Sequence, residues 1–401
     1  MKQCLFTFCL IMSVSCFAAT NSGVAPQQQR RVMQHFTHAI LQHKQPPWGV
    51  SAFSMVAQCK QHAPITVFGG TYTKKGRRLI NKNSIFQIGS ITKSFVSVVI
   101  LQLVEAHKLR LNEVIGRYFP SYPKWGKITV HQLLDMTSGI PDVGGGRHNI
   151  YMHFTAREYH GYVSPTKILN LVYKLPLDFK PGSQYAYSNS NYILLGLLIQ
   201  KVTHHTAQDE IEKRIINKLQ LLHTYYVKNT MATVPGIDVK ALVHGYSFWP
   251  QGTTPYTFQV FGQDTFHFSL SPFSYAGAMI STPTDINKYI HALYTPGILL
   301  SAAQLNAFTT LISTKNGQTF VPEKSPGELG YGLGVFGEYN AHLKTMLYWY
   351  QGKTDGFEFV YMYNQQTQQY LTFGINTISN VINKKNSFRL FYELSALCVE
   401  Q

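Results

Sequence analysis

The chain has 401 residues, of which 45% are hydrophobic and 13% aromatic, enough to bury a large core. It carries 35 Lys and Arg residues against 19 Asp and Glu residues, a formal net charge of +16. The basic residues are scattered and no recognition module accompanies them, so a nucleic-acid-binding function is excluded. The charge has two interpretations: attraction to anionic polymers of the cell envelope, or a surface that keeps the protein soluble.

The chain begins with MKQCLFTFCLIMSVSCFAAT, which has the layout of a secretory signal peptide. One basic residue precedes an apolar run that is too short to span a bilayer, and cleavage after Ala18 leaves small residues at the required positions. A lipoprotein anchor at Cys16 is disfavoured, because Ser13 stands where an aliphatic residue is needed. No later segment reaches the ~18 apolar residues of a transmembrane helix. We therefore expect residues 1–18 to be removed and residues 19–401 to be periplasmic or secreted.

The two ends of the chain predict helices and strands, and the middle predicts mainly helices. Residues 27–44 show helical spacing of apolar side chains, and a strand (GVSAFSMVAQC) with a hairpin partner (PITVFGGTYTKKG) follows. Strand patterns return in MLYWYQGKTDGFEFVYMYN and QQYLTFGIN, before a final helix over 386–398. This order predicts an α/β (α+β) lobe from about 27–90 and 276–401, with a helical lobe, about 91–275, inserted.

Ser90 and Lys93, in FQIGSITKSFVSVVILQLVEAHKL, lie three residues apart and therefore on one face of a helix that begins near Ser90. The segment after Lys93 is apolar on nearly all sides, which is typical of a buried central helix. A hydroxyl at the start of such a helix has three useful neighbours: a backbone N–H for an oxyanion, the positive end of the helix dipole, and an amine one turn away. Ser90 is therefore the candidate nucleophile, because serine needs such activation.

The S-x-x-K spacing alone is weak evidence, since it occurs three times. Ser121 and Lys124 lie in a turn that contains proline, and Ser164 and Lys167 stand at the head of an ordinary surface helix. Only the pair that begins at Ser90 precedes a buried helix. The alternative for Ser90 is a simple helix cap.

A second motif supports the first. Tyr187-Ser188-Asn189, in PGSQYAYSNSNYILLG, is the only Y-x-N in the sequence and lies on a loop before an apolar helix that begins near Tyr192. A phenol beside a lysine ammonium can have a lowered pKa and accept the proton of Ser90. Asn189 can orient the lysine and a substrate amide.

In the order of these motifs the chain resembles the serine β-lactamase-related family, which includes class C β-lactamases, low-molecular-mass D,D-peptidases, and related esterases and aminopeptidases. LNEVIGRYFPSYPKWGKITVHQLLDMTSGIPD is similar to the family segment that ends in HTSGLPD, and YAGAMISTPTDINKYIHALY resembles its AGGLxST segment. The resemblance implies the β-lactamase/transpeptidase-like fold, in which terminal helices flank an antiparallel sheet. It also implies catalytic roles for Ser90, Lys93 and Tyr187, and substrate binding by Asn189.

The third motif of the family, Lys-Thr-Gly or His-x-Gly on an edge strand, is altered in YQGKTDGF. The Gly-Phe pair sets the register and places residues 350–352 at the motif; a register that starts at Lys353 comes three residues late and lacks the final glycine. In the first register the N–H groups of Lys353 and Ser90 form an oxyanion hole, and Tyr350, Gly352 and Lys353 are the expected substrate-binding positions. Tyr350 lacks the usual positive charge, and its alternative role is a plain strand aromatic.

The resemblance implies acyl transfer through an acyl-enzyme on Ser90, without a metal or cofactor. The leading substrate is a D-alanyl-D-alanine-type cell-wall peptide, processed by a carboxypeptidase, penicillin-binding or β-lactamase-like activity. One alternative is an esterase that uses the same serine on neutral esters, and another is a catalytically silent homologue that only binds a ligand. The 16 His residues show no spacing typical of a metal site.

Two cysteines remain once residues 1–18 are removed. Cys59 ends the first predicted strand and Cys398 lies in the last predicted helix, in a compartment that permits disulfides. In the fold that the resemblance implies, the terminal helices pack on that sheet. The pair is therefore either a disulfide or two free thiols, depending on geometry.

Overall fold

The computed structural model of the protein describes residues 24–42, 49–60, 62–145, 155–247, 262–378 and 384–399. The expected signal peptide, residues 1–18, and the disfavoured lipid anchor Cys16 lie outside these ranges, so export stays a prediction. Within these ranges, no helix combines the length and the apolar character that crossing a lipid bilayer requires.

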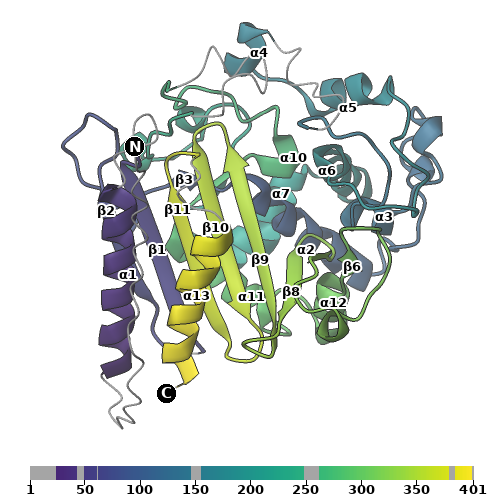
Figure 1. Cartoon of the computed structure of the whole chain (residues 1–401). Helices are drawn as coiled ribbons and strands as arrows, with labels where there is room; N and C mark the ends of the chain where they lie inside the picture. The colour runs from purple at the N-terminus through teal and green to yellow at the C-terminus, as the bar shows by residue number, and fades with distance from the viewer. Residues whose placement is uncertain are drawn as a thin grey trace, which may run out of the picture.

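An antiparallel sheet of eight strands runs through the centre of the molecule, in the order β2-β1-β11-β10-β9-β8-β7-β6 (Figure 1). The first strand pairs with the last one, with Phe53 opposite Ile375, so both ends of the chain build one sheet. The predicted N-terminal hairpin and the C-terminal strands are present. The strands are β1 Ala52–Cys59, β2 Ile65–Gly70, β6 Ile312–Ser313, β7 Gly330–Tyr331, β8 Phe336–Asn340, β9 Thr345–Thr354, β10 Phe357–Asn364 and β11 Gln369–Ile375.

The two terminal helices cover one face of this sheet. α1 (Val24–Gln42) and α13 (Lys384–Val399) contact each other there (Figure 1), close to the helices predicted from the sequence. In α1 the apolar side chains of Met33, Phe36 and Ile40 recur at every third or fourth position, so they form one stripe that packs on the sheet. The arrangement confirms the predicted sheet with flanking terminal helices.

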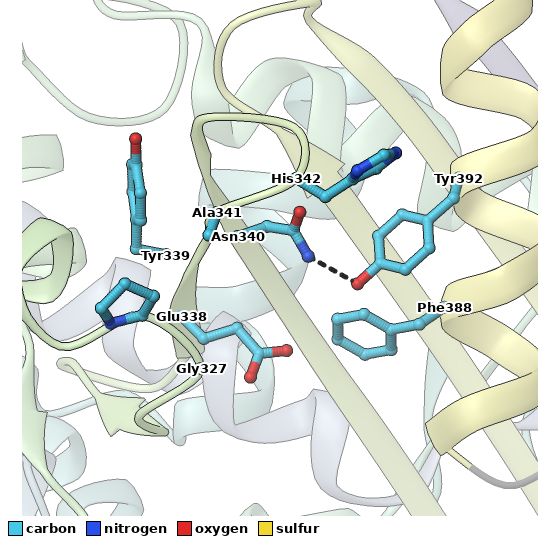
Figure 2. A pocket seen from close by; sticks show the side chains of 9 residues that line it. Gly327, Glu338, Tyr339, Asn340, Ala341, His342, Phe388 and Tyr392 are labelled. Carbon is cyan, nitrogen blue, oxygen red and sulfur yellow. Dashed lines mark hydrogen bonds between the residues drawn. The ribbon is translucent and has the colours of Figure 1, made fainter.

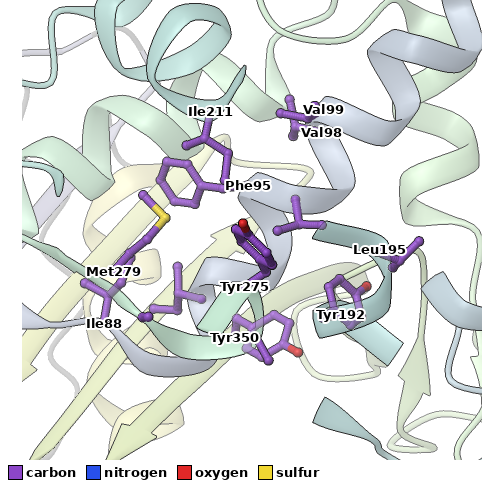
Figure 3. Close-up of a cluster of buried hydrophobic side chains, with 14 of the residues drawn as sticks. Ile88, Phe95, Val98, Val99, Tyr192, Leu195, Ile211, Tyr275, Met279 and Tyr350 are labelled. Atoms are coloured by element: carbon purple, nitrogen blue, oxygen red, sulfur yellow. The ribbon is translucent and has the colours of Figure 1, made fainter. Parts of the chain in front are cut away.

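The other face of the sheet packs on a larger core built around α2 (Thr92–Glu105), whose residues from Thr92 to Leu101 are all buried. Figure 3 shows Phe95, Val98 and Val99 of α2 among side chains from several other elements. Each large apolar side chain that is fully buried in this way contributes about 1.5–3 kcal/mol relative to exposure. This packing fixes the position of the residues at the start of α2.

Further helices and a small second sheet surround α2. The small sheet has the strand order β3-β5-β4, and β3 leads directly into the turn that precedes α2. The division into two lobes near residues 90 and 276 stays a prediction. The strands of the small sheet are β3 Phe86–Gln87, β4 Tyr225–Tyr226 and β5 Met279–Ser281. The other α-helices in the described ranges include α3 Val130–Leu134, α4 Ala156–His160, α5 Pro165–Tyr173, α6 Asn189–Thr203, α7 Ala207–Ile211, α8 Asn217–Leu219, α10 Ser274–Gly277, α11 Pro283–Tyr294 and α12 Ala302–Thr309.

A hollow of about 700 Å³ lies between β8 and α13. Figure 2 shows Phe388 and Tyr392 projecting from α13 toward it, and the side-chain amide of Asn340 donates a hydrogen bond of 2.7 Å to the Tyr392 hydroxyl. Because α13 covers the face of the sheet opposite to α2, this hollow is separated by the sheet from the start of α2.

A disulfide joins Cys59, at the end of β1, to Cys398 near the end of α13. Their Cα atoms are 5.6 Å apart, and the two residues are separated by 339 positions in the sequence. Of the two outcomes open from the sequence, the structure therefore has the bonded one. The bond ties the last helix to the strand that pairs with β11.

We expect Cys398→Ser to lower the free energy of unfolding by about 2–5 kcal/mol, because the unfolded chain is then no longer cross-linked. Denaturant unfolding measures the loss, and Ala396→Ser, at an exposed position of the same helix, is the control. Thiol titration of denatured, unreduced protein that starts at residue 19 should find no free thiol. Two free thiols would contradict the disulfide.

Candidate active site

Ser90 lies in a single 3-10 turn, Gly89–Ile91, that connects β3 to α2. Gly89 has a φ of +50°, a conformation that costs glycine little, and its carbonyl accepts a hydrogen bond of 2.7 Å from the Thr92 hydroxyl. The side chain of Ser90 is half-buried at the amino end of the central helix. This is the position predicted from the sequence.

The amine of Lys93 is fully buried and makes three hydrogen bonds. Its Nζ lies 3.0 Å from Ser90 Oγ, 2.8 Å from Asn189 Oδ1 and 2.7 Å from the carbonyl oxygen of Ala276. The two carbonyl oxygens can only accept, whereas the serine hydroxyl can also donate. When the amine is neutral, its two hydrogens therefore point to Asn189 and Ala276, and its lone pair faces the Ser90 hydroxyl.

The surroundings of Lys93 favour this neutral form. Burial lowers its pKa to about 7, although the nearby carboxylate of Asp142 acts in the opposite direction. An amine with a pKa near neutrality is suited to accept a proton in this pH range.

The phenol of Tyr187 donates a hydrogen bond of 2.9 Å to the Ser90 hydroxyl. The Lys93 amine lies 4.9 Å from the centre of its ring. Burial raises the pKa of Tyr187, and hydrogen bonds to Ser90 and Tyr350 offset this only in part. The sequence-based expectation of a lowered pKa is therefore wrong: burial removes water from the phenolate form and raises the pKa, and the Asp142 carboxylate acts in the same direction.

Asn189 begins α6 and contacts a carboxylate that the sequence analysis did not single out. Its backbone N–H and its side-chain amide both donate to Asp142 Oδ1, at 2.8 and 3.0 Å. Burial raises the pKa of Asp142, and the hydrogen bonds from Asn189 and Gly144 oppose this. The available signal was the position of Asp142, at the end of the segment that is similar to HTSGLPD.

Strand β9 approaches the turn of Ser90 very closely. A Cβ atom at Gly352 would lie 1.9 Å from the carbonyl oxygen of Ile88 and 2.9 Å from the backbone nitrogen of Ser90. A Cβ atom at Gly89 would lie 2.7 Å from the backbone nitrogen of Lys353. The two N–H groups expected to form an oxyanion hole thus belong to segments in direct contact, while the side chain of Lys353 is exposed.

Tyr350 is completely buried, two residues before Gly352 on β9 (Figure 3). Its hydroxyl lies 2.9 Å from that of Tyr331 and 3.4 Å from that of Tyr187. Three phenols therefore form a connected row that ends at Ser90. A direct contact between Tyr350 and substrate stays a prediction.

In the other two S-x-x-K pairs, the lysine amine bonds to a residue other than the serine. Ser164 caps α5 by accepting a hydrogen bond from the backbone N–H of Lys167, whose side chain pairs with Glu158 instead. The Lys124 amine donates to the carbonyl oxygen of Tyr173. In the ranges that the structure describes, no three His, Cys, Asp or Glu side chains are gathered as metal ligands.

The sequence matches the β-lactamase family over residues 55–381. It is 26% identical over 290 residues, or 68% of this chain, to penicillin-binding protein 4* of Bacillus subtilis (strain 168), and 29% identical over 214 residues, or 51% of this chain, to protein flp of Staphylococcus aureus (strain MW2). These matches span 62% and 38% of the lengths of the two relatives.

Two solved structures show the same fold. The D-amino acid amidase of Ochrobactrum anthropi SV3, crystallised with L-phenylalanine amide, superposes with a TM-score of 0.74 at 21% identity, over 93% of this chain and 99% of that one. A D-stereospecific amidohydrolase from a Streptomyces species superposes with a TM-score of 0.70 at 24% identity, over 87% and 94%. These likenesses confirm the predicted fold.

We expect Gly352→Ala to disrupt the site, because the added methyl group overlaps the Ile88 carbonyl. Overpacking of this kind costs about 1–3 kcal/mol and displaces neighbouring backbone. The melting temperature and the extent of covalent labelling of Ser90 should both fall. Gly49→Ala is the control, since the nearest atom to its Cβ would be 3.8 Å away. A fully labelled, stable Gly352→Ala protein would contradict the close approach.

Proposed function

Because the chain belongs to the β-lactamase family, whose members are serine hydrolases, we propose that it is a serine acyl hydrolase that forms an acyl-enzyme on Ser90. The observation that carries this proposal is the set of contacts of the Lys93 amine, which leaves its lone pair facing Ser90. The penicillin-binding and amidase relatives support the same class of reaction.

In the proposed mechanism Lys93 is the base and Tyr187 the proton donor. Neutral Lys93 takes the proton of Ser90 as Oγ attacks the substrate carbonyl, and the N–H groups of Ser90 and Lys353 hold the oxyanion. Tyr187, kept protonated by burial, gives its proton to the leaving group, and the neighbouring Lys93 ammonium then returns a proton to the phenolate. Water then attacks the acyl-enzyme, Lys93 takes its proton, and Ser90 is released with a proton restored.

We propose that the preferred substrates are amides or esters that lack a free carboxylate next to the reacting carbonyl. At the first position of the third motif, a cation contributes about 1.5–3 kcal/mol to binding such a carboxylate. Tyr350 supplies no charge, and its hydroxyl already bonds to Tyr331 and Tyr187. An amino acid amide, the kind of molecule named for the Ochrobactrum enzyme, has no such carboxylate. D-alanyl-D-alanine peptides and penicillins do, so they rank second.

We also propose that the protein works outside the cytoplasm. The first 18 residues have the pattern of a signal peptide, and the Cys59–Cys398 disulfide is suited to an oxidising compartment. The basic surface would there meet anionic envelope polymers.

A fluorophosphonate should modify Ser90 and no other serine. Intact-mass analysis is expected to show one adduct on the unmodified protein and none on Ser90→Ala, whose turnover should fall by about 10⁴–10⁶-fold. Ser121→Ala and Ser164→Ala are the matched controls and should react like the unmodified protein. The protein should also be exposed to a set of esters, amides and penicillins. If neither a fluorophosphonate nor any of these compounds modifies it, the protein is a catalytically silent binding homologue and the proposal fails.

Substrate preference can be tested at Tyr350. We expect the unmodified protein to hydrolyse a neutral D-amino acid amide or ester better than benzylpenicillin. Tyr350→His should raise the rate of penicillin acylation by about 10-fold or more relative to neutral-ester hydrolysis, because it restores a group that can carry charge. Tyr348→His, on the same face of β9, controls for the loss of a buried phenol. Efficient penicillin turnover by the unmodified protein would overturn the preference.

A further inference from the structure

Asp142 is a carboxylate beside the reacting groups, and the mechanism proposed above assigns it no role. We propose that Asp142 is a positioning residue, which acts through Asn189 to keep the Lys93 lone pair on Ser90 and to set the pH at which Lys93 loses its proton. This inference rests on the proposed function. Three features of the site support this role: the direction of the Asn189 amide, the anchoring of Asp142, and the charges that face Lys93.

The direction of the Asn189 amide follows from its two partners. Its Oδ1 accepts from Lys93 Nζ at 2.8 Å, and its Nδ2 donates to Asp142 Oδ1 at 3.0 Å. A reversed amide would donate to the lone pair of neutral Lys93 and draw it away from Ser90, and it would set its oxygen against the carboxylate, which is a repulsive contact. The carboxylate therefore selects the orientation in which Asn189 presents its oxygen to Lys93.

Asp142 is itself anchored to the start of α6. The backbone N–H of Asn189 donates to the same Oδ1 at 2.8 Å. On either side of Asp142, the Ser190 hydroxyl donates to the carbonyl oxygen of Pro141 at 2.7 Å and accepts from the N–H of Val143 at 3.1 Å. These bonds hold the segment of Asp142 against the start of α6 and keep its carboxylate next to Asn189.

Asp142 also acts on Lys93 through its charge. The groups that face the amine are the rings of Tyr187 and Tyr192, at 4.9 and 5.8 Å, and the carboxylate of Asp142; Tyr350 lies beyond Tyr187. Burial raises the pKa of each of these tyrosines, so they are neutral through the working pH range. Asp142 therefore supplies the negative charge that keeps the pKa of Lys93 from falling below about 7.

Removing the charge of Asp142 should move the pH profile of the rate to lower pH. The reaction needs neutral Lys93, so its rate rises as pH increases through the pKa of Lys93. Without the charge of Asp142 this pKa falls further. The midpoint of the rising limb then moves to lower pH, even though the maximal rate declines because the amide is no longer directed.

The test is the rate at which a fluorophosphonate modifies Ser90, measured from pH 5 to 9. We expect Asp142→Asn to lower the maximal rate by about 10–100-fold and to move the midpoint down by about one pH unit. Asp142→Glu keeps the charge and should keep the midpoint while the rate falls. Asp285→Asn is the control: this buried carboxylate accepts from the N–H of His223 and the hydroxyl of Thr224. It should lower the melting temperature and leave the midpoint in place.

The outcomes separate this inference from the proposed function. If the unmodified protein does not react, the proposed function fails. If it reacts and Asp142→Asn keeps both rate and midpoint, or loses rate with an unmoved midpoint, Asp142 has no more than a structural role and the inference is overturned. Should Asp142→Asn not fold, Asp142→Glu decides: a rate equal to that of the unmodified protein overturns the inference.

Discussion

The site depends on one buried amine. Lys93 is the side chain whose nitrogen joins the turn of Ser90, the start of α6 and the carbonyl of Ala276 in α10. A lysine is seldom buried, because its charged form loses the solvation of water. In this site, burial disfavours the charged amine and lowers the pKa of Lys93 to about 7, and the three hydrogen bonds replace those to water. The same burial allows the amine to be neutral near pH 7, as the proposed role of Lys93 as a base requires.

A second constraint is the contact between β9 and the turn of Ser90. It is possible because both sides lack a side chain, at Gly352 and Gly89. It places the backbone of Lys353 next to that of Ser90, and it leaves Tyr350 facing inward, where its hydroxyl contacts Tyr187 and Tyr331. The position that the resemblance aligns with the family's Lys or His is here a tyrosine, which belongs to a row of three phenols. This is the basis of our proposal that substrates without a carboxylate are preferred.

Local patterns in the sequence were sufficient for much of this description. The spacing of Ser90 and Lys93, followed by an apolar helix, placed both residues on one helix face, since the helical period is a property of the backbone. The other two pairs differ from the first because each has a neighbouring proline and neither precedes a buried helix. Alternation of apolar residues predicted the strands, and the order of the motifs predicted the fold. The family match and the superposed structures agree with that fold.

What the sequence by itself determined was which residues share an element and which motifs occur in order. Only the tertiary structure decided the properties that depend on distant segments: the raised pKa of Tyr187, the partners of the Tyr350 hydroxyl, and the pairing of Cys59 with Cys398. Asp142 belongs to the same class, because its importance lies in a contact with Asn189, 47 positions away. The physical reason is that periodicity is local, whereas burial and hydrogen-bond partners are set by segments that meet only in the folded chain.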